Sequence, residues 1–324
     1  MPDLEHWAFP ISLQPKAEEL SFDLASALDA VVMLRSEIPE EAFTASILGT
    51  ERVGSGINID SSGIVLTIGY LITEAEAIWL TTNDGKVVPA HALAHDFQTG
   101  FGLVQPLGRL SAPALQRSTA AGLERGDDVL VIGHGGREHA LKAKVLGRRE
   151  FAGYWEYVLD EAIFTFPAHP EWGGSALIDM SGRLAGVGSL LVQDEIENEA
   201  VKGNMMVPID LLDPILEDLV QRGRRTGLPR PWLGLYAAEA DGHIMVTGLA
   251  RGGPADRAGV KLGDVVKGVA TRKVIDLADF YRKVWRLGPA GTSIPLTLVR
   301  EGVSVEVRVE SIDRSSIMHR PSLQ

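Results

Sequence analysis

Cysteine is absent from this 324-residue chain, which excludes disulfide bonds, thiolate metal sites and a cysteine nucleophile. No stretch approaches the ~18 continuous apolar residues that a membrane-spanning helix needs. The opening MPDLEHWAFPISLQ has no basic segment followed by an apolar one. We therefore predict no signal peptide and a cytoplasmic protein, with a periplasmic location as the alternative if the chain is a shortened form.

Positively charged residues are also few: the chain has 31 Lys and Arg against 43 Asp and Glu, which gives a net charge of −12. An acidic surface repels phosphate backbones, so we expect no nucleic-acid partner. His91 and His95 are the one pair with helical metal-ligand spacing. On a strand, residues four apart lie ~13 Å from each other, too far for one ion. We expect a strand there, and therefore no metal and no cofactor.

Glycine is abundant, at 35 residues, and suits a turn-rich β architecture. From Arg52 to about Ile209, short apolar runs alternate with turn signals at roughly ten-residue spacing, which favours a barrel or a sandwich. Asn83-Asp84-Gly85 is a strong hairpin signal between two such runs.

The pattern changes after this β-rich region. Asp210 to Gly223 has the apolar spacing of an amphipathic helix, and TGLPRP (Thr226 to Pro231) is typical of a linker. A second β-rich stretch follows, interrupted by predicted helices near Pro254 to Ala258 and at Leu277 to Leu287. This predicts a separate α+β module of about 80 residues.

Several segments resemble the HtrA family, whose members join a trypsin-like protease domain to a PDZ domain. The segments are GSGINIDSSGIVLT, LERGDDVLVIGH, GGSALIDMSGRLAGV, PWLGLY and GGPADRAGVKLGDVVKGVATRKVIDLADFYRKV. The resemblance implies a mainly β fold, a trypsin-like double six-stranded β-barrel followed by an α+β PDZ domain. It implies an N-terminal segment over 1–25, a trypsin-like domain over 26–222, a linker over 223–229, a PDZ domain over 230–313 and a tail over 314–324.

The resemblance also places three residues at the family's catalytic positions. Tyr70 in TIGYLI stands where the general base is implied, Gly100 in GFGLV where the orienting Asp is implied, and Gly173 in EWGGSAL where the nucleophilic Ser is implied. Glycine has no nucleophile, and a tyrosine with a pKa near ~10 is a poor base at neutral pH. From this we predict a protein that is not an enzyme, a pseudoprotease with a scaffolding or regulatory role.

An active protease with a displaced nucleophile is the alternative. Ser175 lies two residues after Gly173 and could serve if a histidine lay within hydrogen-bond reach. The candidate bases are His91, His95, His134 and His169. Glu171, which occupies the place implied for an oxyanion-loop glycine, would oppose a developing negative charge.

The PDZ resemblance implies a groove for the carboxyl-terminal end of a peptide or protein. Gly234 would let backbone N–H groups face the terminal carboxylate, and the strand from Leu235 would accept an added peptide strand. Phe280 and Val284, four residues apart, share one helix face. The predicted peptide-binding residues are Arg230, Trp232, Leu233, Gly234, Leu235, Phe280 and Val284.

The N-terminal segment carries apolar residues, namely Trp7, Phe9, Pro10 and Phe22. HtrA-like proteases are commonly trimers built through this segment, so the resemblance implies a possible homo-oligomer. The alternative left open is that these residues pack on their own barrel.

Overall fold

The structure is a computed structural model that describes residues 7–196, 199–240 and 242–319. It divides into two compact units, which are treated separately below. The first comprises residues 1–149, 161–225 and 319–324, and the second comprises 150–160 and 226–318. Among the described residues, no helix has the length and apolar character to cross a membrane.

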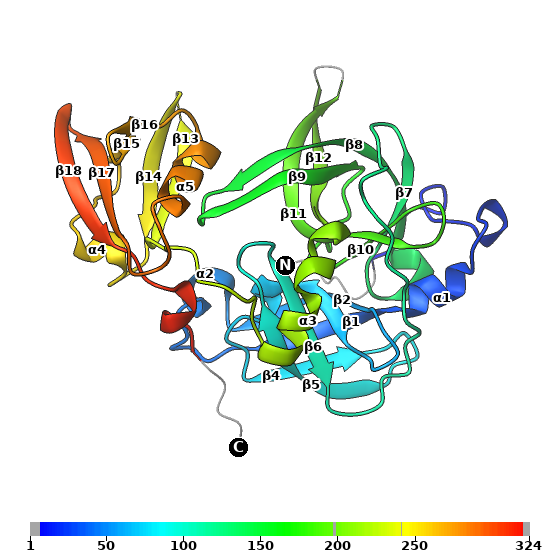
Figure 1. Ribbon diagram of the computed structural model, residues 1–324. Helices are drawn as coiled ribbons and strands as arrows, with labels where there is room; N and C mark the ends of the chain where they lie inside the picture. Colours follow the sequence, from blue (N-terminus) through cyan, green and yellow to red (C-terminus); the bar gives the residue numbers. More distant parts are fainter. Residues whose placement is uncertain (1–6, 197–198, 241, 320–324) are drawn as a thin grey trace. The chain divides into compact units, whose positions relative to one another are not determined.

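The first unit contains two closed six-stranded β-barrels, as the sequence predicts (Figure 1). The first barrel has the strand order β1-β2-β3-β6-β5-β4. Its strands are β1 (Val31–Glu37), β2 (Glu51–Asn58), β3 (Val65–Ile68), β4 (Ala77–Thr81), β5 (Val87–His95) and β6 (Phe101–Pro106). Asp84-Gly85 connects β4 to β5 as expected, with Gly85 in the left-handed region at φ 84°.

The second barrel has the order β10-β11-β12-β9-β8-β7. Its strands are β7 (Asp128–Ile132), β8 (Ala140–Gly153), β9 (Tyr157–Phe166), β10 (Ala176–Ile178), β11 (Leu184–Ile196) and β12 (Glu199–Pro208). The adjoining ends of β8 and β9, within residues 150–160, belong to the second unit. Apolar side chains of these strands fill the barrel, among them Val131, Leu141 and Met206.

Short helices complete the first unit. They are η2 (Ala17–Glu19), α1 (Leu24–Asp29), α2 (Ala45–Leu48), η3 (Gly69–Leu71), η4 (Gly136–His139), η5 (Ile209–Leu211) and α3 (Asp213–Arg222). The amphipathic pattern of 210–223 therefore gives a short 3-10 turn and then α3, which has Pro214 in its first turn and ends at Gly223 in the left-handed region, φ 68°.

The second unit is an α+β module, again as predicted. Its sheet has the order β13-β14-β15-β17-β18, with β16 paired to β15. The elements are β13 (Leu235–Ala240), β14 (His243–Leu249), α4 (Pro254–Arg257), β15 (Val265–Val269), β16 (Arg272–Lys273), α5 (Leu277–Trp285), β17 (Ser293–Arg300), β18 (Val303–Glu310) and η6 (Arg314–Ile317). Because β13 is the first strand in this order, no other strand of the sheet pairs with its outer edge.

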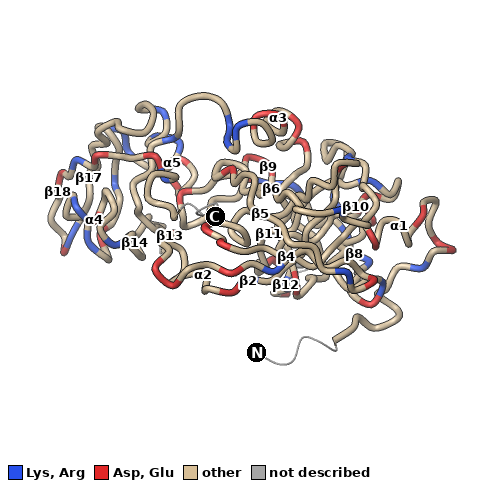
Figure 2. Tube along the Cα trace, turned by 90° about the horizontal axis from the view of Figure 1, so that it is seen from below, with Lys and Arg blue, Asp and Glu red and all other residues tan. Residues whose placement is uncertain are grey.

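Acidic and basic residues are interspersed along the chain (Figure 2). Many of them pair locally. Arg300 on β17, for example, donates from Nε and Nη2 to the two carboxylate oxygens of buried Asp264, at 2.7 Å each.

Candidate functional site

The structure brings together the three residues that the resemblance places at catalytic positions. Tyr70 lies in η3 directly after β3, Gly100 directly precedes β6, and Gly173 precedes β10. The Gly69 N–H donates to the Gly100 carbonyl at 2.7 Å. A Cβ added at Gly173 would lie 2.9 Å from the Tyr70 hydroxyl oxygen. That these positions correspond to a catalytic triad stays a prediction.

Tyr70 is held as a neutral hydrogen-bond donor. Its hydroxyl donates to the Ser189 carbonyl at 2.9 Å, and burial raises the pKa of Tyr70 well above its usual value. The backbone carbonyl of Tyr70 accepts from Nη1 of Arg52 at 2.6 Å. Gly100 has φ 85°, a conformation that a side chain adopts only with strain.

Ser175, the alternative nucleophile, is fully buried. Its hydroxyl donates to the Trp172 carbonyl at 3.0 Å. A Cβ at Gly188 would lie 2.2 Å from the Ser175 Oγ, so the hydroxyl faces backbone. Attack by Ser175 would therefore require the loop before β10 to rearrange.

The four candidate histidines are placed differently. His91 and His95 lie on β5, and the His95 ring lies against Gly69 with its Nδ1 2.6 Å from the Thr73 hydroxyl. No group of three or more potential metal ligands occurs among the described residues.

His134 and His169 lie with Glu171 instead. Oε2 of Glu171 is 3.7 Å from Nε2 of His134 and 3.8 Å from Nδ1 of His139. Burial lowers the pKa of His134 and lowers that of His169 to about 4.

The N-terminal segment packs on this cluster. Trp7 Nε1 donates to Glu171 Oε1 at 3.0 Å, and the Trp7 and Phe9 rings meet His169 edge-on. Phe22 contacts Gly182. Three of the four apolar residues thus contact the chain's own barrel, while Pro10 is exposed. A homo-oligomer stays a prediction, and residues 1–6 lie outside the described ones.

The predicted peptide groove lies in the second unit, and its backbone amides converge on one carboxylate. The N–H groups of Leu233, Gly234 and Leu235 donate to Glu156, with closest distances of 3.0, 2.8 and 3.1 Å. Gly234 has φ 69°, which turns the chain so that the three amides point the same way. Glu156 sits in the turn between β8 and β9, and nothing in the sequence near Leu233 pointed to it.

The other predicted groove residues are mostly buried. Leu233, Leu235, Phe280 and Val284 belong to the apolar core of this unit, each 1% exposed or less. The Arg230 guanidinium lies over the Trp285 ring, 4.2 Å from its centroid. Burial raises the pKa of Glu156, and Arg314, a cation that the sequence did not single out, acts in the opposite direction. Their roles in peptide binding stay predictions.

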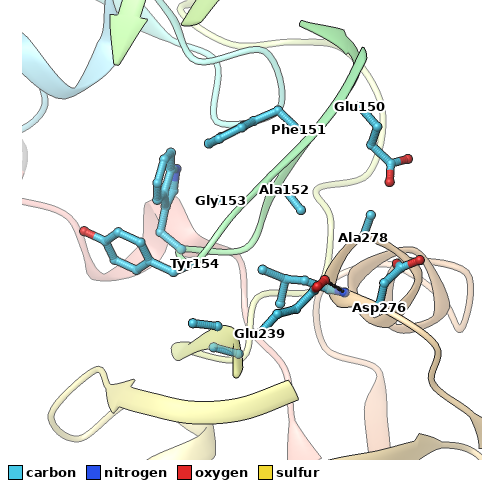
Figure 3. Close-up of a pocket in the computed structure, with 12 residues that line it drawn as sticks. Glu150, Phe151, Ala152, Gly153, Tyr154, Glu239, Asp276 and Ala278 are labelled. Atoms are coloured by element: carbon cyan, nitrogen blue, oxygen red, sulfur yellow. Dashed lines mark hydrogen bonds between the residues drawn. The ribbon is translucent and has the colours of Figure 1, made fainter. Parts of the chain in front are cut away.

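A pocket of about 550 Å³ opens beside the groove (Figure 3). One wall is the hairpin segment 150–155, and the other is formed by 237–239 of β13 and by 276–278 at the start of α5. Glu239 accepts from the Leu277 N–H at 2.8 Å, the interaction drawn in Figure 3.

Comparison with known proteins identifies both domains. Residues 54–187 match the trypsin-like peptidase domain, and residues 231–310 match the PDZ domain. "Probable periplasmic serine endoprotease DegP-like" of Chlamydia pneumoniae is 24% identical over 274 residues, 79% of this chain and 54% of that protein. "Serine protease Do-like HtrA" of Lactobacillus helveticus is 24% identical over 294 residues, 81% of this chain and 69% of that protein.

A solved structure, "HtrA-type protease AlgW with decapeptide", has the same fold, with a TM-score of 0.54 at 20% identity over 90% of this chain and 99% of that chain. The predicted fold and the resemblance to HtrA-type proteins are therefore confirmed. The chain spans about half the length of several of the curated relatives that it matches.

Two predictions are wrong. The prediction that the chain is not an enzyme is contradicted, because the matched relatives are named serine endoproteases. Three residue types at implied positions were too narrow a basis for it. The predicted cytoplasmic location is contradicted by relatives named periplasmic. The composition of the opening residues was too narrow a basis for that inference.

Proposed function

We propose that this chain, which joins a trypsin-like domain to a PDZ domain as HtrA-type proteins do, binds the carboxyl-terminal ends of peptides or proteins in the groove of its PDZ domain. The observation that carries the proposal is the convergence of three backbone N–H groups, from Leu233, Gly234 and Leu235, on a single carboxylate. Such a set of amides recognises a carboxylate without any cationic side chain.

The strand next to these amides supports the same function. No other strand of the sheet pairs with the outer edge of β13, and this is the edge to which an extended peptide would add as a further strand. Main-chain hydrogen bonds would then supply affinity, and the apolar side chains below would contact the terminal residue.

The test is a titration of the full chain with a fluorescein-labelled decapeptide that ends in valine. We expect saturable binding with a Kd of roughly micromolar order, or about −8 kcal/mol. The matched control is the same peptide with an amidated end, which removes the carboxylate and should weaken binding at least tenfold. Equal affinity for the two peptides would refute recognition of the carboxylate.

Serine endopeptidase activity is a second candidate, and the names of the relatives favour it. With Gly173 at the implied position, Ser175 is the serine to test. Casein cleavage and labelling by a fluorophosphonate should both be lost in Ser175→Ala if this serine is the nucleophile. Ser181→Ala is the matched control, because Ser181 lies in the exposed turn that follows β10. Turnover that survives Ser175→Ala would exclude Ser175 from the chemistry.

A further inference from the structure

We infer that the turn between β8 and β9 is an internal ligand of the PDZ groove, and that a peptide must displace Glu156 from the amides of Leu233, Gly234 and Leu235 before it binds. This inference rests on the proposed function, because it concerns the regulation of the same groove. It follows from four sets of contacts within the second unit.

The first contact is the carboxylate itself. Oε1 of Glu156 accepts from all three amides, and Oε2 accepts from Leu233 as well. Glu156 is only 8% exposed. Its side-chain carboxylate therefore occupies the donors that a terminal carboxylate would use, and the two cannot be bound at once.

The second contact is a strand-like hydrogen bond beside the carboxylate. The Ala237 N–H donates to the Tyr154 carbonyl at 3.1 Å. From the first contact to the second, the residue numbers fall along the hairpin, from Glu156 to Tyr154, and rise along β13, from Leu235 to Ala237. The two segments therefore run in opposite directions, as an antiparallel strand added to the outer edge of β13 would.

A third contact comes from helix α5. The Tyr281 hydroxyl donates to the same Tyr154 carbonyl at 3.0 Å. The hairpin thus contacts both β13 and α5, and Figure 3 shows its segment from Glu150 to Tyr154 opposite Glu239 and Asp276. These are the two elements that border the predicted peptide groove.

Charged and apolar contacts hold the stem of the hairpin. Arg282 on α5 forms ion pairs with Glu150 on β8 and Asp160 on β9. Val158 is buried in the core of the second unit. Because both stem strands are anchored, the turn is presented to the groove as a constrained, tethered ligand, which loses less entropy on binding than a free peptide does.

Glu156 also has an unusual backbone for its residue type. Its φ is 63°, in the left-handed region that favours glycine. Glu301, in the turn between β17 and β18, provides a matched control because it is an exposed glutamate with φ 50°. Replacing either one by alanine leaves a residue with a Cβ in the left-handed region, but only Glu156 contacts the amides.

The experiment measures the affinity of the full chain for the valine-ended decapeptide by fluorescence anisotropy at pH 7.5. The apparent Kd is the intrinsic Kd divided by the fraction of chains whose groove is free. If the hairpin occupies nine chains in ten, Glu156→Ala should bind about tenfold more tightly than the wild type. Glu301→Ala should bind as the wild type does.

The outcomes separate the two proposals. If Glu156→Ala and the wild type bind within twofold of each other, the internal ligand is overturned and the proposed function stands. If no variant binds the peptide, Glu156→Ala included, the proposed function is overturned and the inference with it.

Hydrogen exchange keeps the test valid if Glu156→Ala folds poorly. In the wild type without peptide, the amides of Leu233, Gly234 and Leu235 should be protected. In Glu156→Gly, which removes the acceptor and suits the φ of 63°, they should exchange at least tenfold faster, while the amides of β17 and β18 keep their protection. Rapid exchange of these three amides in the folded wild type would overturn the inference without any variant.

Discussion

Replacing Glu156 by glutamine should remove a pH dependence from the stability of the unit formed by 150–160 and 226–318. Burial raises the pKa of Glu156 from 4.5 to about 7, although three N–H donors and Arg314 act in the opposite direction. A carboxyl group with a raised pKa in the folded state stabilises that state when it is protonated. Its contribution is therefore complete below about pH 4.5 and is lost as the pH rises through about 7.

The size of the effect follows from the two pKa values. At about 1.4 kcal/mol per pH unit, a rise from 4.5 to about 7 corresponds to a loss of about 3 kcal/mol. The other titratable groups that act electrostatically with Glu156 are Tyr236 and Tyr281. Burial raises the pKa of both tyrosines, so they stay neutral over this range. Arg314 is then the charged partner of the carboxyl group, and it stays charged throughout.

The assay is hydrogen exchange on residues 226–318 between pH 4.5 and 8, corrected for the intrinsic effect of pH on exchange. The wild type should lose about 3 kcal/mol of protection relative to Glu156→Gln as the pH rises. Parallel profiles for the two proteins would refute the assignment of the raised pKa to Glu156. A wild type that gains protection with pH would show that hydrogen bonding to the carboxylate outweighs burial.

Three further perturbations test the contacts described above. Arg282→Ala removes two partly exposed ion pairs to the hairpin, worth about 0.5 kcal/mol each, so the valine-ended peptide should bind two- to fivefold more tightly. Unchanged affinity would show that Arg282 does not hold the hairpin in the groove. His169 has a pKa lowered to about 4, so its contribution to stability is lost as the pH falls below 6.5 towards 4. In denaturant unfolding, the free energy of unfolding of His169→Gln should therefore fall less on acidification than that of the wild type, by up to about 3 kcal/mol. Equal losses in the two proteins would contradict this. Asp264→Asn weakens the paired hydrogen bonds with Arg300 and should cost about 2 kcal/mol in denaturant unfolding; a change below about 0.5 kcal/mol would show that the pair is not stabilising.

The fold could be predicted because its signals are local. Asp84-Gly85 requires a left-handed residue between two apolar runs, and the structure has one there. The spacing of Leu277 to Leu287 indicates a helix, and α5 covers most of that range. Turn residues and apolar periodicity act over a few positions, so they can be recognised without knowing what packs against them.

The candidate sites depend on contacts that no local pattern contains. Glu156 is 77 residues from Leu233, its hydrogen-bond partner. The one signal in the sequence is its setting, since a single acidic residue lies between Trp155 and Tyr157 in a turn where solvent exposure would be expected. Similarly, Arg230 is the cation nearest to Gly234 in the sequence, yet its guanidinium lies over Trp285, while Arg314 acts on the carboxylate.

Glu156 differs from a peptide end in one chemical respect, which bears on how a partner could displace it. The last residue of a peptide carries both a carboxylate and a side chain. Glu156 uses its side chain as the carboxylate, so it has none left to contact the apolar residues below the groove. A valine-ended partner adds that apolar contact, and full burial of such a side chain is worth about 1.5–3 kcal/mol. The hairpin has a different advantage, because its tether gives Glu156 a high effective concentration at the amides and ion pairs anchor both of its stem strands. Competition in the groove is therefore between apolar contact on the side of the free peptide and tethering on the side of the hairpin.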